Sequence, residues 1–397
     1  MKRFYLLLVS CLCSISILMG CTKPPTPSVQ EGTSEEETVT KKWLSNEATT
    51  DYYRTILPYK SSPTRGLIYS SKYSKVNNRY DIDSFELSLM RESKSYFDPK
   101  DVYFQEGQYL TKDVVRQMLA KKKTQAELET QLEIDSNYED LGLNPSTDET
   151  IQINGVDVKS PVYLAYLLEQ DYLVQEGDDT VLSGVTIGLA LNPYQSWENE
   201  LNYTQTVALE EETLISKGQE IAQQVIEILR KQEELKSVPI MIGLYIVEEE
   251  SAVTPGHMVS KTLVAADSQE IKGWEAVNEH YYLLPNDDTL ALDANLSNQY
   301  STFKEVIKEY YPHYYGIVGV AHFMDNKLES LEITVNLDFY GLAEKLSFHQ
   351  LLSQLIKEIF APEYNINVVV RSSDEIYGVL LRPSNSDEVV LKLTNWK

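Results

Sequence analysis

The clearest pattern along the chain is a strand–helix–strand succession that occurs twice. In segments 185–191 and 331–337 apolar residues alternate with polar or small ones, and this period of two predicts a β-strand. After each strand, apolar residues recur every three or four positions, which predicts an amphipathic helix, and a second apolar run then predicts another strand. The helices are expected at 215–232 and 348–360, and the second strands at 239–247 and 365–371.

Short motifs support a relation between the two halves. Segment 55–59 resembles segment 282–286, and further on segment 185–194 resembles segment 331–340. We therefore predict an α+β fold made of two tandem related repeats, each packed in two layers. The first repeat is expected to be enlarged by an insertion over much of residues 97–180. The alternative is that short apolar motifs match by chance.

The C-terminal part shows a hairpin pattern. Strand-like segments 316–323 and 328–337 flank Asp325-Asn326, a dipeptide typical of tight turns. A helix over residues 300–310 is expected before the hairpin. The chain is expected to close with strands at 376–382 and 389–393.

Composition changes this picture in three ways. With 42% hydrophobic residues, the 397-residue chain can bury a sizeable core and is not expected to be disordered as a whole. Its formal net charge of −25 repels phosphate backbones, so no nucleic-acid partner is expected. The cysteines, Cys11, Cys13 and Cys21, lie near the start, which leaves no downstream residue for a disulfide or a thiolate metal site.

The first residues have the organisation of an export signal. A positively charged start precedes an apolar run over residues 4–19, which is too short to span a bilayer comfortably. Segment 18–21, Leu-Met-Gly-Cys, resembles a bacterial lipobox, in which the cysteine sulfur receives a diacylglyceryl group. We therefore expect Cys21 to be lipidated. A plain secretory signal with a chance cysteine is the alternative.

Residues 21–50 are expected to form a disordered, lipidated linker, because they contain prolines, a glutamate run and few apolar side chains. Two acyl chains, at about 0.8 kcal/mol per buried CH₂, anchor a protein stably without a transmembrane helix. The expected location is therefore the extracytoplasmic face of the plasma membrane, held by the lipid anchor. The expected domains are a signal peptide at 1–20, this linker, a first repeat at 51–255 and a second repeat at 256–397.

Several further motifs occur in one order along almost the whole chain. They lie at 53–60, 65–67, 141–146, 160–172, 184–191, 254–256 and 338–341. Together with the lipobox, these motifs resemble the CamS family of sex pheromone lipoproteins from Gram-positive cocci. The resemblance implies that lipoprotein signal peptidase cuts between Gly20 and Cys21, and that membrane proteolysis of the leftover leader releases a short peptide.

In that family the released peptide stimulates conjugative plasmid transfer by responder enterococci. The resemblance therefore implies three partners: the plasma membrane, the lipoprotein-processing enzymes and a receptor on responder cells. The alternative is that the peptide is the ordinary end of a lipoprotein leader and has no receptor. The corresponding peptide here is Ser14, Ile15, Ser16, Ile17, Leu18, Met19 and Gly20.

The rest of the chain carries no motif of an enzyme or of a cofactor site. It has no nucleophile elbow, no zinc-protease motif, no phosphate-binding loop and no dinucleotide fingerprint. We therefore expect a non-catalytic body without cofactor or metal, although 60 acidic residues leave a carboxylate-based hydrolase open. A second function is a ligand-binding lipoprotein with a pocket between the two repeats. Tyr282, Tyr314 and Tyr340 are proposed to line that pocket, and the alternative places them at the rim of the core.

Overall fold

The computed structural model describes residues 42–44, 52–67, 79–198, 203–249, 251–313 and 316–394. The chain divides into two compact units, Met1–Thr40 and Lys41–Lys397, and every element below belongs to the second unit. The signal peptide, Cys21 and all but three residues of the expected linker lie outside the described residues.

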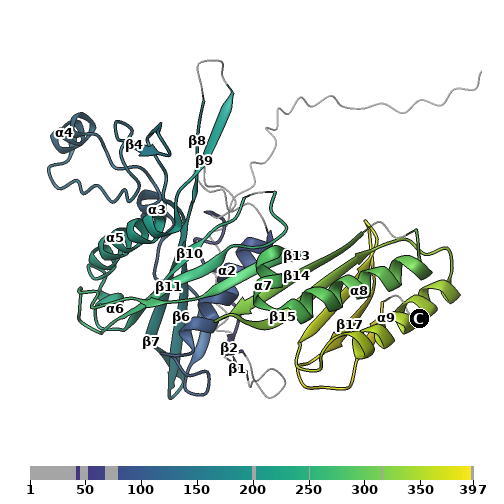
Figure 1. Ribbon diagram of the computed structural model, residues 1–397. Coiled ribbons are helices and arrows are strands. Elements are labelled where there is room, and N and C mark those ends of the chain that lie inside the picture. Colours follow the sequence, from purple (N-terminus) through teal and green to yellow (C-terminus); the bar gives the residue numbers. More distant parts are fainter. Residues whose placement is uncertain are drawn as a thin grey trace, which may run out of the picture. The chain divides into compact units, whose positions relative to one another are not determined.

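Eight strands in the described part of the chain form the first sheet (Figure 1). In order across the sheet they are β1 (Lys42–Trp43), β2 (Arg54–Leu57), β3 (Tyr103–Glu106), β6 (Leu164–Glu176), β7 (Asp179–Leu191), β10 (Ile240–Ile246), β11 (His257–Val264) and β12 (Glu275–Ala276). The helices of this half are α2 (Arg79–Ser93), α3 (Lys112–Met118), α4 (Gln125–Ile134), α5 (Glu211–Leu229) and α6 (Glu233–Lys236). Two separate hairpins are β4 (Thr150–Ile153) with β5 (Val156–Lys159), and β8 (Tyr194–Glu198) with β9 (Thr204–Ala208).

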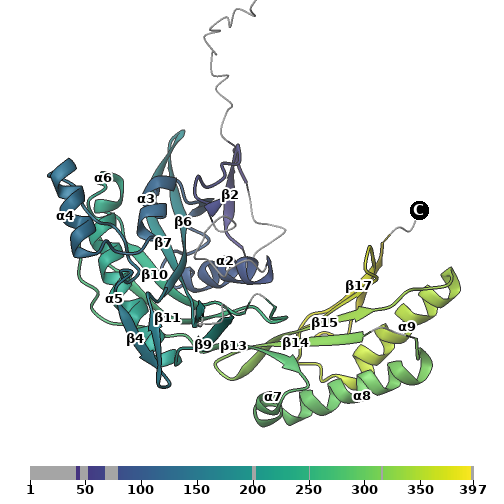
Figure 2. The same cartoon turned by 90° about the horizontal axis from the view of Figure 1, so that it is seen from above.

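Helices α2 and α5 cover opposite faces of this sheet (Figures 1 and 2). Successive residues of β7 point to opposite faces. Gly188 lies against Phe85 and Leu89 of α2, whereas Leu191 lies against Gly218 of α5. All of β10 is buried, as expected for a central strand covered on both sides.

Six strands in the described C-terminal part form the second sheet. In order they are β13 (Glu279–Leu284), β14 (Gly316–Met324), β15 (Lys327–Asn336), β16 (Ile366–Arg371), β17 (Ile376–Arg382) and β18 (Val390–Leu393). The helices of this half are α7 (Asp287–Leu292), α8 (Ala294–Tyr310) and α9 (Leu342–Ile359).

Helices α8 and α9 lie on the same face of this second sheet (Figure 2). Gly319 of β14 lies against Tyr300 of α8, and Gly378 of β17 lies against His349 of α9. Residues of β14 alternate between buried and half-buried, so only one of its faces is fully packed. We call the other face, which carries the half-buried residues, the open face.

The structure confirms the α+β fold and both strand–helix–strand successions, β7–α5–β10 and β15–α9–β16. The two strands of each succession pair in parallel. The predicted hairpin is also present, as β14 and β15. Asp325 and Asn326 take φ values of 50° and 62° at its turn, where short polar residues are the ones that tolerate such angles.

The tandem repeat stays a prediction. Its best support in the fold is strand order, since β6-β7-β10-β11 and β14-β15-β16-β17 have the same succession of antiparallel, parallel and antiparallel pairs.

Three predicted boundaries are wrong. The insertion was expected over much of residues 97–180, but this segment contains β3 and β6, which lie inside the first sheet. The first sheet does not end at residue 255, because β11 forms hydrogen-bonded pairs with β10 and β12 follows it. The expected linker does not reach residue 50 unstructured, because Lys42 and Trp43 pair with Leu57 and Ile56.

Candidate functional site

A cavity of about 690 Å³ lies between α2 and the open face of the second sheet. Its floor is formed by alternate residues of two neighbouring strands, because side chains of a strand share a face at every second position. From β14 these are Val318, Val320 and His322, and from β15 they are Ser330, Glu332, Thr334 and Asn336. Arg371 of β16 lies beside Asn336 and closes one end of the floor.

The opposite wall of the cavity is the side of α2 that faces away from the first sheet. Leu87 and Met90 are apolar parts of this wall, and Arg91, with Lys94 just beyond the helix, is its basic part. Phe85 and Leu89 lie on the other side of the same helix and pack on the first sheet. One amphipathic helix therefore completes the core of the first half and lines the cavity at the same time.

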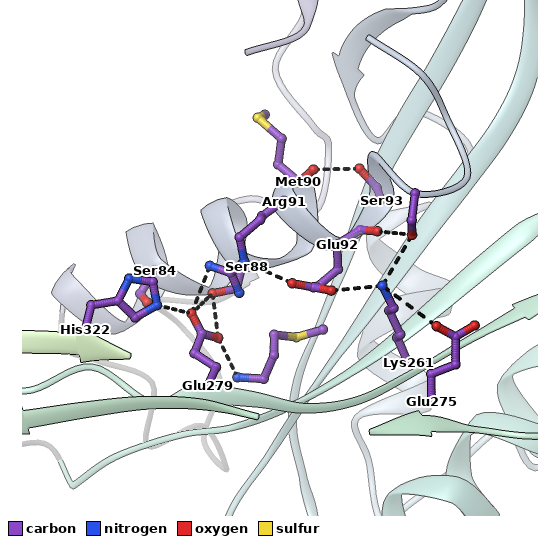
Figure 3. A network of polar contacts seen from close by, with 12 residues as sticks. Ser84, Ser88, Met90, Arg91, Glu92, Ser93, Lys261, Glu275, Glu279 and His322 are labelled. Carbon is purple, nitrogen blue, oxygen red and sulfur yellow. Dashed lines mark hydrogen bonds and ion pairs between the residues drawn. The ribbon is translucent and has the colours of Figure 1, made fainter. Parts of the chain in front are cut away.

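Glu279 is the central group of a polar network at one end of the cavity (Figure 3). It is the first residue of β13, and its side chain has no exposed surface. Arg91 Nη1 lies 2.9 Å and His322 Nε2 lies 3.0 Å from Glu279 Oε1. The backbone N–H of Met258 donates to Oε2 over 2.8 Å, and the Ser88 hydroxyl donates to both oxygens.

These contacts decide the charge of Glu279. Burial on its own raises the pKa of a carboxyl group, but here the donors from His322, Arg91 and Met258 outweigh it and lower the pKa to about 2. Glu279 is therefore ionised at neutral pH, and His322 Nε2 must carry the hydrogen that it shares with Glu279. The ring of Tyr281 stacks on His322 at a centroid distance of 4.3 Å and lines the same end of the cavity.

The network continues along α2 to the first sheet (Figure 3). Arg91 Nε donates to Glu92 over 2.9 Å, and Lys261 of β11 lies 2.9 Å from the other oxygen of Glu92. The Glu92 and Lys261 side chains are only 10% and 12% exposed. Groups from α2, β11, β13 and β14 are thus joined through largely buried charges.

A second cavity of about 360 Å³ lies along the same helix and shares Leu87 and Met90 with the first. Arg65 Nη2 binds Glu86 over 2.8 Å and Glu106 over 2.9 Å at its wall. Burial raises the pKa of Glu86. At Glu106 burial has the same tendency, but the hydrogen bonds from Arg65 and the Ser62 backbone lower its pKa.

A buried carboxyl pair lies on β6, and one of its members, Glu169, lines this second cavity. Glu169 and Asp171 are two residues apart on β6 and therefore share a face of the strand. Backbone N–H groups of Tyr109 and Leu110 donate to Glu169, and that of Gln108 donates to Asp171. Burial and the charge of Glu169 raise the pKa of Asp171 to about 10, so the pair holds a proton at neutral pH.

The predicted tyrosine groove is not where the cavity lies. Tyr282 does not line it, because its ring packs edge-on against Phe323 at 5.8 Å, on the helix-covered face. Tyr340 is 91% exposed and does not line the cavity, and Tyr314 lies outside the described residues. The neighbouring Tyr281 lines the cavity instead, because adjacent residues of a strand point to opposite faces.

The structure adds three facts about the other sites considered from the sequence. Within the described ranges, no three His, Cys, Asp or Glu side chains gather as a metal site. In the same ranges, no helix has the length and apolar character needed to cross a bilayer. Cys21, Gly20 and the peptide Ser14–Gly20 lie outside these ranges, so their chemistry stays a prediction.

Sequence reasoning missed the Glu279 network and the Glu169–Asp171 pair. An available signal for the pair was the polar triplet Glu169-Gln170-Asp171 inside the otherwise largely apolar stretch Leu164–Val174. Glu279 gives no such signal, because its partners Arg91 and His322 are far from it in sequence.

Comparisons with known proteins agree with this fold. The family model described as "CamS sex pheromone cAM373 precursor" matches residues 59–388. The crystal structure of a sex pheromone precursor from Lactobacillus salivarius is 25% identical, with a TM-score of 0.78, and the match covers 90% of this chain and 100% of that one. The C-terminal domain of the sex pheromone staph-cAM373 precursor from Staphylococcus aureus is also 25% identical, with a TM-score of 0.67, and 81% of this chain and 99% of that one are covered.

A search among curated proteins gives no match. The family model nevertheless covers most of the chain, including strands of both sheets. The chain therefore belongs to the CamS family of sex pheromone cAM373 precursors.

Proposed function

We propose that the chain is the precursor of two products, a lipid-anchored surface protein and a short peptide released from its leader. The observation that carries this proposal is the lipobox-like segment 18–21, which ends an apolar leader in a chain whose body matches the family over residues 59–388. Lipidated Cys21 holds the body at the extracytoplasmic face of the plasma membrane. The body acts there without catalysis.

The second product is the peptide Ser14–Gly20, which carries no charged side chain. A short uncharged peptide can leave the bilayer, and it still offers Ile15, Ile17 and Leu18 for burial in a receptor. In this proposal the receptor belongs to responder cells, whose response is conjugative plasmid transfer. Signal peptidase cleavage before Cys21 is required for the release.

The substitution Cys21→Ala tests the anchor. The wild-type protein is expected to take up labelled palmitate and to sediment with membranes, whereas the variant should lose the label, because no other cysteine follows residue 21. Cys13→Ala is the matched control, since it removes a leader cysteine and should leave labelling unchanged. Palmitate label on the Cys21→Ala variant would contradict the proposal.

The same two strains test the peptide. Mass spectrometry of the culture fluid should detect Ser14–Gly20 from the wild-type and Cys13→Ala strains but not from the Cys21→Ala strain. Synthetic peptide added to a parallel sample shows that detection works. A wild-type culture without the peptide, in which the added peptide is detected, would rule out its release.

A ligand-binding role of the body is the second candidate function, and the cavity beside α2 favours it. Its volume of about 690 Å³ lies within the range of small-ligand sites, and its lining combines apolar residues with a few charged ones. The cavity stands between α2, which packs on the first sheet, and the open face of the second sheet.

A further inference from the structure

We propose that the cavity beside α2 binds a short apolar peptide with free termini, and that its occupant is the peptide Ser14–Gly20 cut from the chain's own leader. The inference rests on the proposed release of this peptide, whereas the binding itself can be measured with a synthetic peptide. Length, terminal charges and side-chain alternation each support this occupant.

The floor of the cavity matches the length of a heptapeptide. It includes every second residue of β15 from Ser330 to Asn336, a segment of seven residues. At a rise of about 3.3 Å per residue, this strip is about 20 Å long. The Cα atoms at the two ends of an extended peptide of residues 14–20 are separated by the same six steps, about 20 Å.

Opposite charges lie along this strip. Arg371 lies beside Asn336 at one end, and Glu332 lies two residues in from Ser330, from where its side chain can reach toward the other end. Within the described chain, the Arg371 side chain makes a single hydrogen bond, from Nε to the carbonyl oxygen of Ser372. Its remaining N–H groups can bind a terminal carboxylate in a forked geometry, and Glu332 can bind a terminal ammonium group.

The other basic groups near the Ser330 end do not oppose this orientation. Arg91 is already paired with ionised Glu279, and His322 is hydrogen-bonded to the same carboxylate, so both groups are engaged inside the network. Lys94 and Asp83 also line the cavity, and each has an interaction within the protein. A peptide amine placed near Glu332 therefore meets one unbalanced carboxylate, and a peptide carboxylate near Arg371 meets one unbalanced guanidinium group. This arrangement selects a zwitterion over an anion.

The middle of the cavity fits the alternation within the peptide. An extended chain places Ile15, Ile17 and Met19 on one side and Ser14, Ser16 and Leu18 on the other. The cavity offers an apolar helix wall at Leu87 and Met90 and a floor with hydroxyl groups at Ser330 and Thr334. The peptide can thus bury Ile15, Ile17 and Met19 against α2 and direct its serines toward the sheet, where Val318 and Val320 of the floor can accommodate Leu18.

Isothermal titration of the folded body with synthetic peptides tests the proposal. The body used is Lys41–Lys397, which forms a compact unit. The match with the crystallised Lactobacillus relative covers 90% of this chain and 100% of that one. We expect the peptide Ser14–Gly20 with free termini to bind. A C-terminally amidated peptide and an N-terminally acetylated peptide should each bind at least tenfold more weakly.

Two variants assign each peptide end to its residue. Arg371→Gln should weaken binding of the free peptide and abolish the difference between the free and amidated forms. Glu332→Gln should likewise abolish the difference between the free and acetylated forms. Lys392→Gln and Glu329→Gln are matched controls, because both residues are exposed on the same sheet but do not line the cavity. They should bind all peptides as the wild type does.

A scrambled peptide of the same composition, with its isoleucines adjacent, tests the occupant. Binding of the scrambled peptide with equal affinity, or an amidation effect that persists in Arg371→Gln, would overturn the proposal. The proposal would also be overturned if the free peptide failed to bind a body whose cooperative unfolding shows that it is folded. If the synthetic peptide binds but cells release none, the proposed function fails and the binding site stands. If cells release the peptide but the body does not bind it, the binding proposal fails and the proposed function stands.

Discussion

At the scale of single residues, the buried pair Glu169 and Asp171 shows how the fold stores a proton. Asp171 Oδ1 is buried and has no donor within the described chain, although the Glu169 carboxyl group lies beside it. Two ionised carboxylates in this place would repel each other without screening. A proton held between them removes the repulsion and provides the missing hydrogen bond.

This proton makes stability depend on pH. Between about pH 4, where an unfolded aspartate ionises, and about pH 10, the pKa of Asp171 in the folded protein, the native state binds more protons than the unfolded state. The free energy of unfolding should therefore fall as pH rises through this window, by up to about 1.4 kcal/mol per pH unit for one proton.

Asp171→Asn should remove this slope, because an amide donates a hydrogen bond to Glu169 without taking up a proton. Urea unfolding from pH 5 to pH 9 should show the variant gaining stability over the wild type as pH rises. Asp113→Asn is the control, since its side chain is 82% exposed, and its stability curve should run parallel to the wild type. Parallel curves for Asp171→Asn would show that the pair holds no proton.

Single residues also show the limit of sequence reasoning about the site. A tyrosine lining was predicted, and the structure places Tyr281 there rather than Tyr282. Composition and clustering pointed to the correct strand, but the choice of face depends on where α8 packs, and that is a tertiary contact. The pairing of Glu279 with Arg91 is also a tertiary contact, because Glu279 belongs to the second sheet and Arg91 to a helix that packs on the first.

At the scale of elements, α2 depends on small residues in the sheet beneath it. A Cβ atom at Gly188 would lie 2.2 Å from a methyl group of Leu89 and 2.6 Å from the ring of Phe85. Such distances are far inside van der Waals contact, so β7 approaches the helix only because residue 188 has no side chain. The position of the cavity wall follows, because Leu87 and Met90 lie on the same helix.

Gly188→Ala should therefore destabilise the protein by about 1–3 kcal/mol, the usual cost of overpacking a core. It should also weaken binding of the leader peptide, because the helix must shift toward the cavity. Gly316→Ala is the matched strand control, since nothing lies within 4 Å of a Cβ atom there. Denaturant midpoints of both variants give the comparison. Equal midpoints would show that α2 adjusts without cost.

Elements with a clear period were predictable, and elements with mixed chemistry were not. The alternation of Val185–Leu191 and the apolar stripe of the last helix gave β7 and α9 correctly, although α9 begins earlier, at Leu342. β6 was missed because buried Glu169, Gln170 and Asp171 interrupt its apolar run. Their burial is possible only with partners from the loop at 107–110, which a local pattern cannot show.

At the scale of the whole folded body, the Glu279 network joins elements of both sheets. Glu279 begins the second sheet, and it receives donors from Arg91 on α2, from Met258 on β11 and from His322 on β14. Removing one of these donors would leave a buried carboxylate incompletely hydrogen-bonded, which costs stability. The network should therefore make the two halves unfold together, which keeps both walls of the peptide cavity in place.

Glu279→Gln tests this coupling. An amide cannot balance Arg91, so the variant should lose about 3 kcal/mol and its two halves should unfold in separate steps, seen by calorimetry as a broadened or double transition. Because the folded pKa of Glu279 is lowered to about 2, its contribution is complete above about pH 4.5 and is lost as pH falls toward 2, so the variant's deficit should shrink in acid.

The charge balance gives a sharper version of the same test. Adding Arg91→Met to Glu279→Gln removes the unpaired cation as well, so the double variant should recover part of the lost stability if the two groups are coupled. Glu275→Gln controls for charge at the edge of the network, because that side chain is 65% exposed and lies 4.0 Å from Lys261. A double variant whose loss equals the sum of the two single losses would mean that Glu279 and Arg91 act independently, and the polar coupling of the halves would then rest on the contacts of Glu279 with Met258 and His322.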